Sequence, residues 1–300
     1  MTACLTFAGT WAAPGTGYPS EVAHACTDLL EEIPVQAPWS FGPIPPGQIT
    51  APSYQDSVAI AGDWAVHWIE THPERPIILG GYSQGAEAAS RVRMEFEIGR
   101  LSTLRPNFIA GYTFGNPSRH LEHTFYNGPA TDGEGIAAFR LPALGHEWCE
   151  LVDTYDIYAG VPPTLTGEIM HDVYTLCTQL QLADPHQFVT DLVANCIEII
   201  QNLDGNAHDD LLDGAARHGL DLSGARILAP EDFALTTDRI LSVKGIAAAI
   251  QAAVLGIQFL CWTPPTAPHI EYHLREVLPS QTYVELGVQH VRDWANRILA

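Results

Sequence analysis

IILGGYSQGAEAAS, residues 77–90, changes character at its centre. A hydrophobic run typical of a buried β-strand meets a serine set between glycines, and an alanine-rich segment typical of a helix follows directly. The pentapeptide GYSQG at 81–85 fits the pattern G-x-S-x-G, and a strand before it with a helix after it is the context of a nucleophile elbow. Glycines let such a strained turn project the serine hydroxyl while the strand and helix pack closely behind it. The stretch therefore predicts an α/β sheet that carries a nucleophilic Ser83, and it favours this over a plain strand-to-helix turn.

The chain on both sides continues this alternation. Strands are expected near residues 3–8, 33–37, 76–81, 107–114, 136–141 and 149–152. Helices are expected near residues 20–32, 54–72, 85–100, 168–182, 187–202, 236–260 and 282–299. Alternating strands and helices predict an α/β fold with a mainly parallel central sheet flanked by helices. Between 157 and 235 helical patterns follow one another without a convincing strand, so we expect a core of residues 1–156 and 236–300 with a helical insertion at 157–235.

Composition narrows the classes of partner. The 300 residues are 46% hydrophobic and 16% charged, which is typical of a folded globular chain. Fourteen basic residues against 35 acidic ones give a formal net charge of −21, which repels a phosphate backbone, so no nucleic-acid partner is expected. The cysteines form no CxxC pair, which favours buried reduced thiols over a disulfide framework. They are Cys4, Cys26, Cys149, Cys177, Cys196 and Cys261.

Three further segments concern targeting, membrane insertion and metal binding. MTACLTFAGTW at residues 1–11 has no basic segment before a long apolar one, so no conventional secretory signal peptide is expected. The apolar stretch 240–262 is long enough to span a membrane, but one lysine and two glutamines interrupt it, so we expect a buried or lipid-facing helix and no transmembrane segment. Residues 204–216 lack the glycine and final glutamate of a calcium loop, and His120 and His123 lack a third ligand, so no metal site is expected.

A serine nucleophile needs a histidine base within hydrogen-bond reach and a carboxylate that orients the base. In α/β folds with this elbow the order along the chain is serine, then acid, then histidine. Asp153 and Asp156 both follow a hydrophobic stretch, and either can be the acid. His269 and His273 lie after a proline-rich loop late in the chain, whereas His290 lies inside the last helical pattern and is expected to be a surface or packed residue.

Short motifs resemble the cutinase-like serine esterases of the α/β-hydrolase fold. GGYSQGA at 80–86 resembles their elbow, AGTW at 8–11 resembles the Gly-Thr pair beside their oxyanion hole, and FGNP at 114–117 also recurs in the group. Secreted cutinases bracket their acid with disulfide-forming cysteines, whereas this chain has Cys149 before the acid and Ala159 after it. Together with the long helical insertion between acid and base, this makes the chain most similar to the mycobacteriophage lysin B family, which hydrolyses the ester joining mycolic acids to arabinogalactan.

The resemblance implies roles for particular residues. Ser83 matches the family's nucleophile. Asp156, in Asp-Ile-Tyr-Ala, resembles the segment that holds the acid and is preferred to Asp153, and His269 matches the His-x-x-Tyr pattern around the base and is preferred to His273.

The resemblance also extends to the surroundings of the triad. It implies that Thr10 and Gln84 supply backbone N–H groups to the oxyanion, and we expect Trp11, Tyr82 and Tyr272 to contact the substrate. The implied substrate is mycolyl-arabinogalactan or another lipid ester, with no cofactor. Synthesis is implied in the host cytoplasm, and action at the host envelope after other lysis proteins open the membrane. Two alternatives stay open: a cutinase- or lipase-like esterase for shorter acyl chains, and a catalytically silent envelope-binding protein.

Overall fold

The structure is a computed structural model, which describes residues 1–42, 51–121, 123–125, 132–179, 252, 256, 263–264 and 266–299. Within these ranges a five-stranded sheet has the order β2-β1-β3-β4-β5, and all of its strand pairs are parallel. The strands are β1 (Thr2–Phe7), β2 (Leu30–Pro34), β3 (Ile77–Tyr82), β4 (Phe108–Phe114) and β5 (Trp148–Leu151). The predicted parallel sheet is therefore confirmed.

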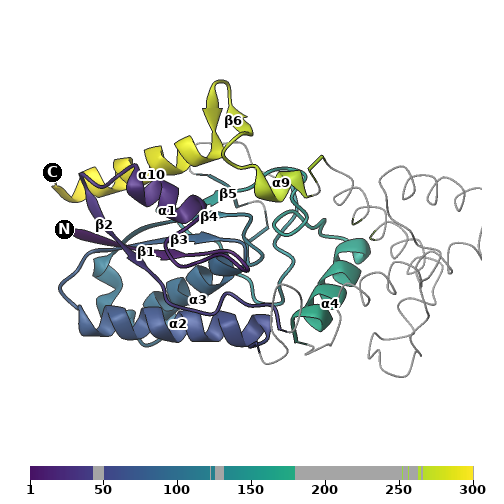
Figure 1. The fold of residues 1–300 in the computed structure, drawn as a ribbon, viewed down its shortest axis with the longest axis horizontal. Coiled ribbons are helices and arrows are strands. Elements are labelled where there is room, and N and C mark those ends of the chain that lie inside the picture. The colour runs from purple at the N-terminus through teal and green to yellow at the C-terminus, as the bar shows by residue number, and fades with distance from the viewer. Residues whose placement is uncertain are drawn as a thin grey trace, which may run out of the picture.

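Helices cover both faces of this sheet (Figure 1). On one face lie α1 (Tyr18–His24) and α10 (Tyr283–Leu299), and on the other lie α2 (Tyr54–Thr71) and α3 (Gln84–Ile98). The remaining described elements are the 3₁₀ helix η1 (Ser102–Asn107), α4 (Leu165–Gln179), α9 (Ala267–Ile270) and the hairpin of β6 (Glu276–Leu278) with β7 (Gln281–Thr282). The carboxyl ends of the strands face α9 and α4, which places the loops after β1, β3, β4 and β5 at one end of the molecule.

Strands β1, β3, β4 and β5 are buried on both faces, as continuous apolar runs in a parallel sheet require, whereas the edge strand β2 is partly exposed. Leu5 and Leu79 join the core beneath α2 and α3, whereas their neighbours Cys4 and Ile78 join the core beneath α1 and α10. This alternation follows from the two-residue repeat of a strand. The sheet is consequently held from both sides, and its strand ends form a rigid base for the loops.

Several predicted boundaries differ from the structure. Residues 136–141 are a loop rather than a strand, because their backbone N–H groups bond to other loops: Ile136 to the Tyr158 carbonyl, and Ala137 to the Pro117 carbonyl. The expected helix 20–32 is shorter, since α1 ends at His24 and a turn leads into β2. The β6–β7 hairpin was not predicted. The expected helices 187–202 and 236–260 lie essentially outside the described residues, and of the insertion 157–235 only its start, with α4, is described; the domain division stays a prediction.

Within the described ranges Cys4, Cys26 and Cys149 are buried, and none of the three forms a disulfide. Among the described residues no helix is long and apolar enough to cross a membrane, and the stretch 240–262 lies almost entirely outside them. Across the same ranges no group of three or more His, Cys, Asp and Glu side chains is placed to hold a metal ion.

The buried side chain of His290 is expected to make the stability of the protein depend on pH. Its ring is buried in α10, with Nε2 donating to the Gly111 carbonyl at 3.0 Å, and burial lowers its pKa from an ordinary 6.5 to about 4. Between these pH values the unfolded chain binds a proton that the folded chain does not, so the free energy of unfolding falls as pH drops from 6.5 to 4, by up to about 3 kcal/mol. Urea unfolding measured between pH 7 and pH 4.5 should show that the free energy of unfolding falls less steeply in His290→Gln than in wild type. Parallel curves for the two proteins would contradict this.

Candidate active site

Ser83 stands on a strained turn between β3 and α3. Its backbone has φ 54° and ψ −120°, and its N–H donates to the Phe114 carbonyl at 3.0 Å. Both flanking glycines are sterically required. A Cβ on Gly81 would lie 2.6 Å from the Ala86 Cα, and a Cβ on Gly85 would lie 2.2 Å from the Phe7 carbonyl oxygen. The glycines of G-x-S-x-G thus let α3 pack against the ends of β1 and β3 while the serine projects from the turn.

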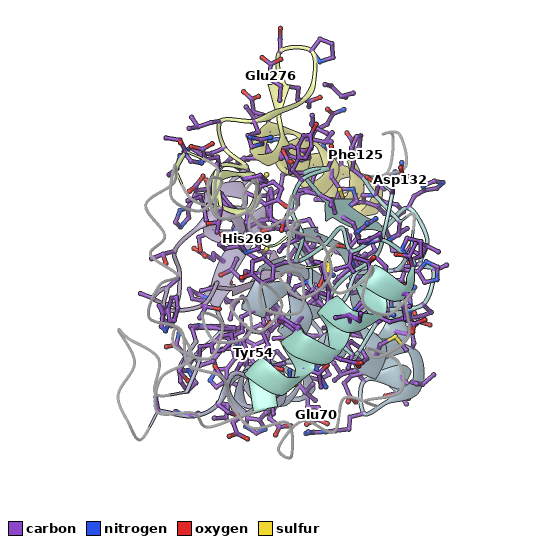
Figure 2. The ribbon with its side chains drawn as sticks, turned by 90° about the vertical axis from the view of Figure 1, so that its right-hand side faces the viewer. Tyr54, Glu70, Phe125, Asp132, His269 and Glu276 are labelled. Carbon is purple, nitrogen blue, oxygen red and sulfur yellow. The ribbon has the colours of Figure 1, made fainter. Side chains whose placement is uncertain are left out.

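His269 lies in α9 and meets the serine directly. Its Nε2 is 2.9 Å from the Ser83 Oγ, and the side chain is nearly buried. The hydroxyl of Tyr82 donates to the His269 carbonyl at 3.0 Å, and the ring of Tyr158 lies 4.6 Å from the imidazole, centroid to centroid. Figure 2 places His269 on the end of the molecule that α4 crosses. Short-range contacts from two other segments therefore fix the position of this histidine.

Asp156 completes the line on the far side of the imidazole. Its Oδ2 lies 2.8 Å from the His269 Nδ1, and its side chain is fully buried. The Tyr158 N–H donates to Oδ1 at 3.0 Å, and the Tyr272 hydroxyl donates to Oδ2 at 2.5 Å. Since an ionised carboxylate only accepts hydrogen bonds, Nδ1 of His269 carries the proton and Nε2 is free to accept the proton of the Ser83 hydroxyl.

The alternatives for acid and base occupy other positions. Asp153 pairs with the Arg275 guanidinium and accepts the Tyr155 N–H at 2.9 Å, and burial raises its pKa against the effect of Arg275. His273 instead has its Nδ1 3.3 Å from the Tyr18 hydroxyl. The structure thus brings together Ser83, His269 and Asp156, and not Asp153 or His273.

The FGNP motif supplies a glycine that the site needs. Gly115 has φ +55°, and a Cβ there would lie 2.6 Å from Asp156 Oδ2 and 2.7 Å from His269 Cε1. The absence of a side chain at this position lets acid and base approach each other. Gly115 is not among the site residues expected from the sequence, although the FGNP motif is the signal that points to it.

Gly115→Ala is expected to lower kcat for ester hydrolysis about 100-fold, because a displacement of about 1 Å within a catalytic group has an effect of that size. Steady-state kinetics with p-nitrophenyl butyrate would measure it. Gly62→Ala is the matched control, since a Cβ at Gly62 meets nothing within 4 Å. Equal activities in the two variants would show that the triad has more room than the structure gives it.

Buried polar side chains hold the loops that carry the site. Asn116 donates to the Ser90 Oγ and to Glu150 Oε1, both at 2.9 Å. Arg119 is fully buried, and its Nε donates to the Ala159 carbonyl at 2.6 Å, which ties the segment after Asp156 to the loop after β4. Arg119 is not predicted as a site residue, because nothing in its local sequence pattern marks it as buried.

Two of the residues expected at the substrate are turned toward the triad. Tyr272 is fully buried and its hydroxyl donates to Asp156, and its contact with substrate stays a prediction. The Tyr82 hydroxyl bonds to the His269 carbonyl, and its contact with substrate stays a prediction. Trp11 is 48% exposed in the loop after β1, with its ring 6.5 Å from that of Phe41, and remains a candidate for substrate contact.

Tyr272→Phe is expected to lower kcat about tenfold with KM within twofold, since hydrogen bonds to charged groups contribute about 1.5–3 kcal/mol. Without this donor the Asp156 carboxylate is held less firmly against His269 Nδ1, so the loss should appear in kcat rather than in KM. Tyr283→Phe is the control, because its ring packs on Tyr272 with a 5.2 Å centroid separation. A kcat as high as that of the Tyr283→Phe control would reduce Tyr272 to a packing residue.

The residues expected at the oxyanion lie beside the elbow. Gln84 is the first residue of α3, where backbone N–H groups have no acceptor within the helix. The close approach of Gly85 to the Ala8 carbonyl brings the loop that contains Thr10 next to this helix start. The N–H groups of Thr10 and Gln84 make no hydrogen bond to any residue that the structure describes. Their role as oxyanion donors stays a prediction.

Comparison with solved structures gives the fold a context. The crystal structure of lysin B from mycobacteriophage D29 matches with a TM-score of 0.55 and 16% identity, covering 97% of this chain and 98% of that one. A cutinase-like protein from Cryptococcus sp. has a TM-score of 0.40 and 15% identity, covering 50% of this chain and 74% of its own. The catalytic core domain of acetyl xylan esterase from Trichoderma reesei has a TM-score of 0.39 and 15% identity, covering 60% of this chain and 98% of its own.

No protein-family model and no curated protein matches the sequence. At 16% identity the likeness to lysin B shows a shared fold over nearly the full length of both chains. The expected α/β-hydrolase fold is thereby confirmed.

Proposed function

We propose that this protein is a serine esterase. The observation that carries the proposal is the continuous line from Ser83 Oγ through both nitrogens of His269 to Asp156, with hydrogen-bond distances of 2.9 and 2.8 Å. Ser, His and Asp in this geometry perform acyl transfer on unrelated folds, so the arrangement supports the activity independently of the fold.

The geometry supports a two-step reaction. Ser83 Oγ bonds to the ester carbonyl carbon as His269 Nε2 takes its proton, and Asp156 stabilises the imidazolium. The carbonyl oxygen becomes an oxyanion, and the N–H groups of Thr10 and Gln84 stabilise it by donating hydrogen bonds. His269 then protonates the departing alcohol as the C–O bond breaks. Water, deprotonated by His269, attacks the acyl-enzyme, and His269 returns the proton to Ser83 Oγ as the C–O bond breaks and the acid leaves.

The substrate we propose is the ester between mycolic acid and arabinogalactan, acted on at the host cell envelope after other lysis proteins release the enzyme. The full-length likeness of fold to lysin B and the motifs at residues 8–11, 80–86 and 114–117 support it. Exposed apolar side chains also support a lipid ester. Trp11, Tyr155 and Ile270 are 39–61% exposed, and each directly follows or precedes a residue of the proposed site. Each buried CH₂ of an acyl chain contributes about 0.8 kcal/mol.

The experiment compares p-nitrophenyl butyrate hydrolysis with mycolic acid release from purified mycolyl-arabinogalactan. Release of both products supports the proposed substrate. Hydrolysis of the short ester alone would identify a cutinase- or lipase-like esterase for shorter acyl chains. Binding to envelope material without hydrolysis of either, unchanged in Ser83→Ala, would identify a silent envelope-binding protein.

A further inference from the structure

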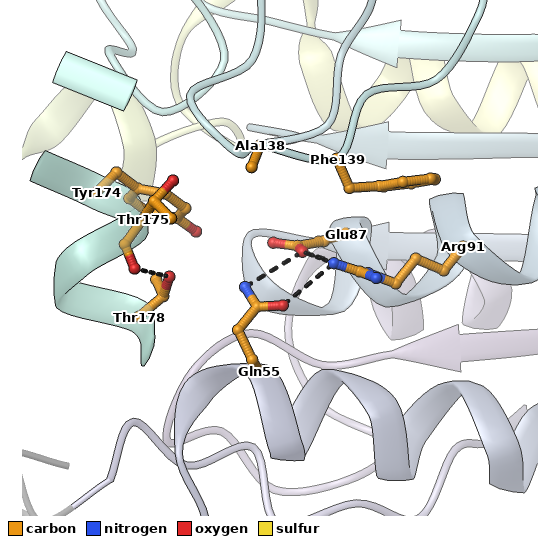
Figure 3. Close-up of a pocket in the computed structure, with 8 residues that line it drawn as sticks. All are labelled: Gln55, Glu87, Arg91, Ala138, Phe139, Tyr174, Thr175 and Thr178. Atoms are coloured by element: carbon orange, nitrogen blue, oxygen red, sulfur yellow. Dashed lines mark hydrogen bonds and ion pairs between the residues drawn. The ribbon is translucent and has the colours of Figure 1, made fainter. Parts of the chain in front are cut away.

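A cavity lies between α2, α3, α4 and the loop at residues 138–139, and no triad residue lines it (Figure 3). It has a volume of about 310 Å³. Its lining residues are Gln55, Glu87, Arg91, Ala138, Phe139, Tyr174, Thr175 and Thr178. We propose that this cavity binds one sugar ring of the alcohol part of the substrate. The inference rests on the proposed esterase function and adds a subsite to it.

The charged groups of the cavity neutralise each other. Glu87 is fully buried and accepts hydrogen bonds from the Tyr54 hydroxyl at 3.1 Å and from Arg91 Nη2 at 2.8 Å. Gln55 Oε1 in turn accepts from Arg91 Nη2 at 3.1 Å. Because one carboxylate is paired with one guanidinium, the cavity has no excess charge that would attract a phosphate or a metal ion. A neutral ligand fits this environment.

Hydrogen-bonding capacity remains at the cavity wall. The Thr175 hydroxyl and Arg91 Nη1 make no hydrogen bond to any residue within the described ranges, and the Thr178 hydroxyl, which donates to the Thr175 carbonyl at 3.1 Å, can still accept. Beside these polar groups stand Ala138 and the rings of Phe139 and Tyr174 (Figure 3). A sugar ring matches this lining, because its hydroxyl groups both donate and accept hydrogen bonds and its ring has an apolar face.

The size of the cavity favours a ring over an acyl chain. About 310 Å³ is at the lower end of ligand pockets, and the mixed polar wall would leave a long alkyl chain against unsatisfied polar groups. The acyl part of a lipid ester therefore lies elsewhere, and the alcohol part is the candidate occupant.

The cavity is close to the reacting centre. The Glu87 N–H donates to the Ser83 carbonyl at 3.2 Å, so its wall begins one helical turn, about 5.4 Å, beyond the nucleophile. On the other side, the ring of Tyr158 lies 6.3 Å from that of Tyr174 and 4.6 Å from that of His269. Figure 2 shows α4 crossing the end of the molecule that bears His269 and Tyr54. A sugar ring in the cavity can thus belong to the ester that the triad attacks.

The test uses two esters with the same acyl group, methyl 5-O-octanoyl-arabinofuranoside and p-nitrophenyl octanoate. Thr175→Val removes one hydroxyl at constant shape, Thr175→Ser restores it, and Ala138→Trp fills the cavity from an exposed position. For the sugar ester we expect KM to rise about fivefold in Thr175→Val, to return in Thr175→Ser, and to rise more than tenfold in Ala138→Trp. For the p-nitrophenyl ester, whose leaving group has no sugar hydroxyls, kcat/KM should stay within twofold in Thr175→Val and Thr175→Ser.

A direct binding measurement separates this inference from the esterase proposal. Ligand-observed NMR with methyl arabinofuranoside and Ser83→Ala protein should show binding that Ala138→Trp, added to that background, abolishes. If the protein bound the sugar but hydrolysed no ester, the esterase proposal would be wrong and the sugar site would still stand. Hydrolysis of both esters with equal changes in every variant, or with none, would overturn the sugar site and leave the esterase standing.

Discussion

Ser83→Ala is expected to lower kcat for p-nitrophenyl butyrate about 10⁵- to 10⁶-fold, the size of effect seen when a triad nucleophile is removed. The variant keeps the fold, because the serine backbone and both glycines that shape the turn are unchanged, and only the Oγ that lies 2.9 Å from His269 is lost. Far-UV circular dichroism and Tm should match wild type. Ser102→Ala, at an exposed serine of η1, is the matched control with wild-type kinetics.

Residual activity of Ser83→Ala above about 1% of wild type, in protein free of wild-type contamination, would contradict the role of nucleophile. The residual rate of a triad without its serine is about 10³–10⁴-fold above the reaction in water, far below that threshold. If Ser83→Ala lost activity and also had a lower Tm, misfolding would explain the loss. An unchanged Tm excludes that explanation.

Asp156→Asn is expected to lower kcat about 10⁴-fold with the geometry intact, because an amide at this position favours the wrong tautomer of the base. Asp153→Asn is the matched variant, since both aspartates follow β5 and both are buried, but only Asp156 contacts His269. Asp153 pairs with Arg275, and its substitution should lower kcat less than tenfold and reduce Tm. The same two variants assayed for kcat and for thermal unfolding separate catalysis from stability.

A larger loss of kcat in Asp153→Asn than in Asp156→Asn would contradict this assignment. It would mean that the loop after β5 rearranges during catalysis and presents the other carboxylate to the base.

The elbow could be predicted from the sequence because its signal is local. A strand, a pentapeptide with two glycines and a helix lie within 14 consecutive residues, and each glycine has a contact that excludes a Cβ. The base and acid are 113 residues apart, and only the resemblance to a family brought them together beforehand. Residue types and spacing alone left Asp153 and Asp156 equal. The choice depends on the turn at residues 153–156, where the Asp156 N–H bonds to the Asp153 carbonyl.

Other features depend on contacts that no local pattern carries. Arg119 is buried because loop carbonyls from residues distant in sequence surround it, and Tyr272 is buried because it bonds to an aspartate 116 residues earlier. Residues 136–141 have the apolar content of a strand, yet they contact the core as a loop whose N–H groups find partners outside the sheet. In residues 136–141 tertiary contacts therefore override the local propensity for a strand.

The most direct test of the account is covalent labelling with diethyl p-nitrophenyl phosphate, followed by intact-mass measurement and peptide mapping. A working triad attacks the phosphorus, releases p-nitrophenolate and leaves a diethyl phosphoryl group on the serine oxygen. The account predicts one adduct, on Ser83, that is absent from Ser83→Ala and forms at least 100-fold more slowly in His269→Ala. An unmodified protein, or an adduct on another residue that persists in Ser83→Ala, would contradict it.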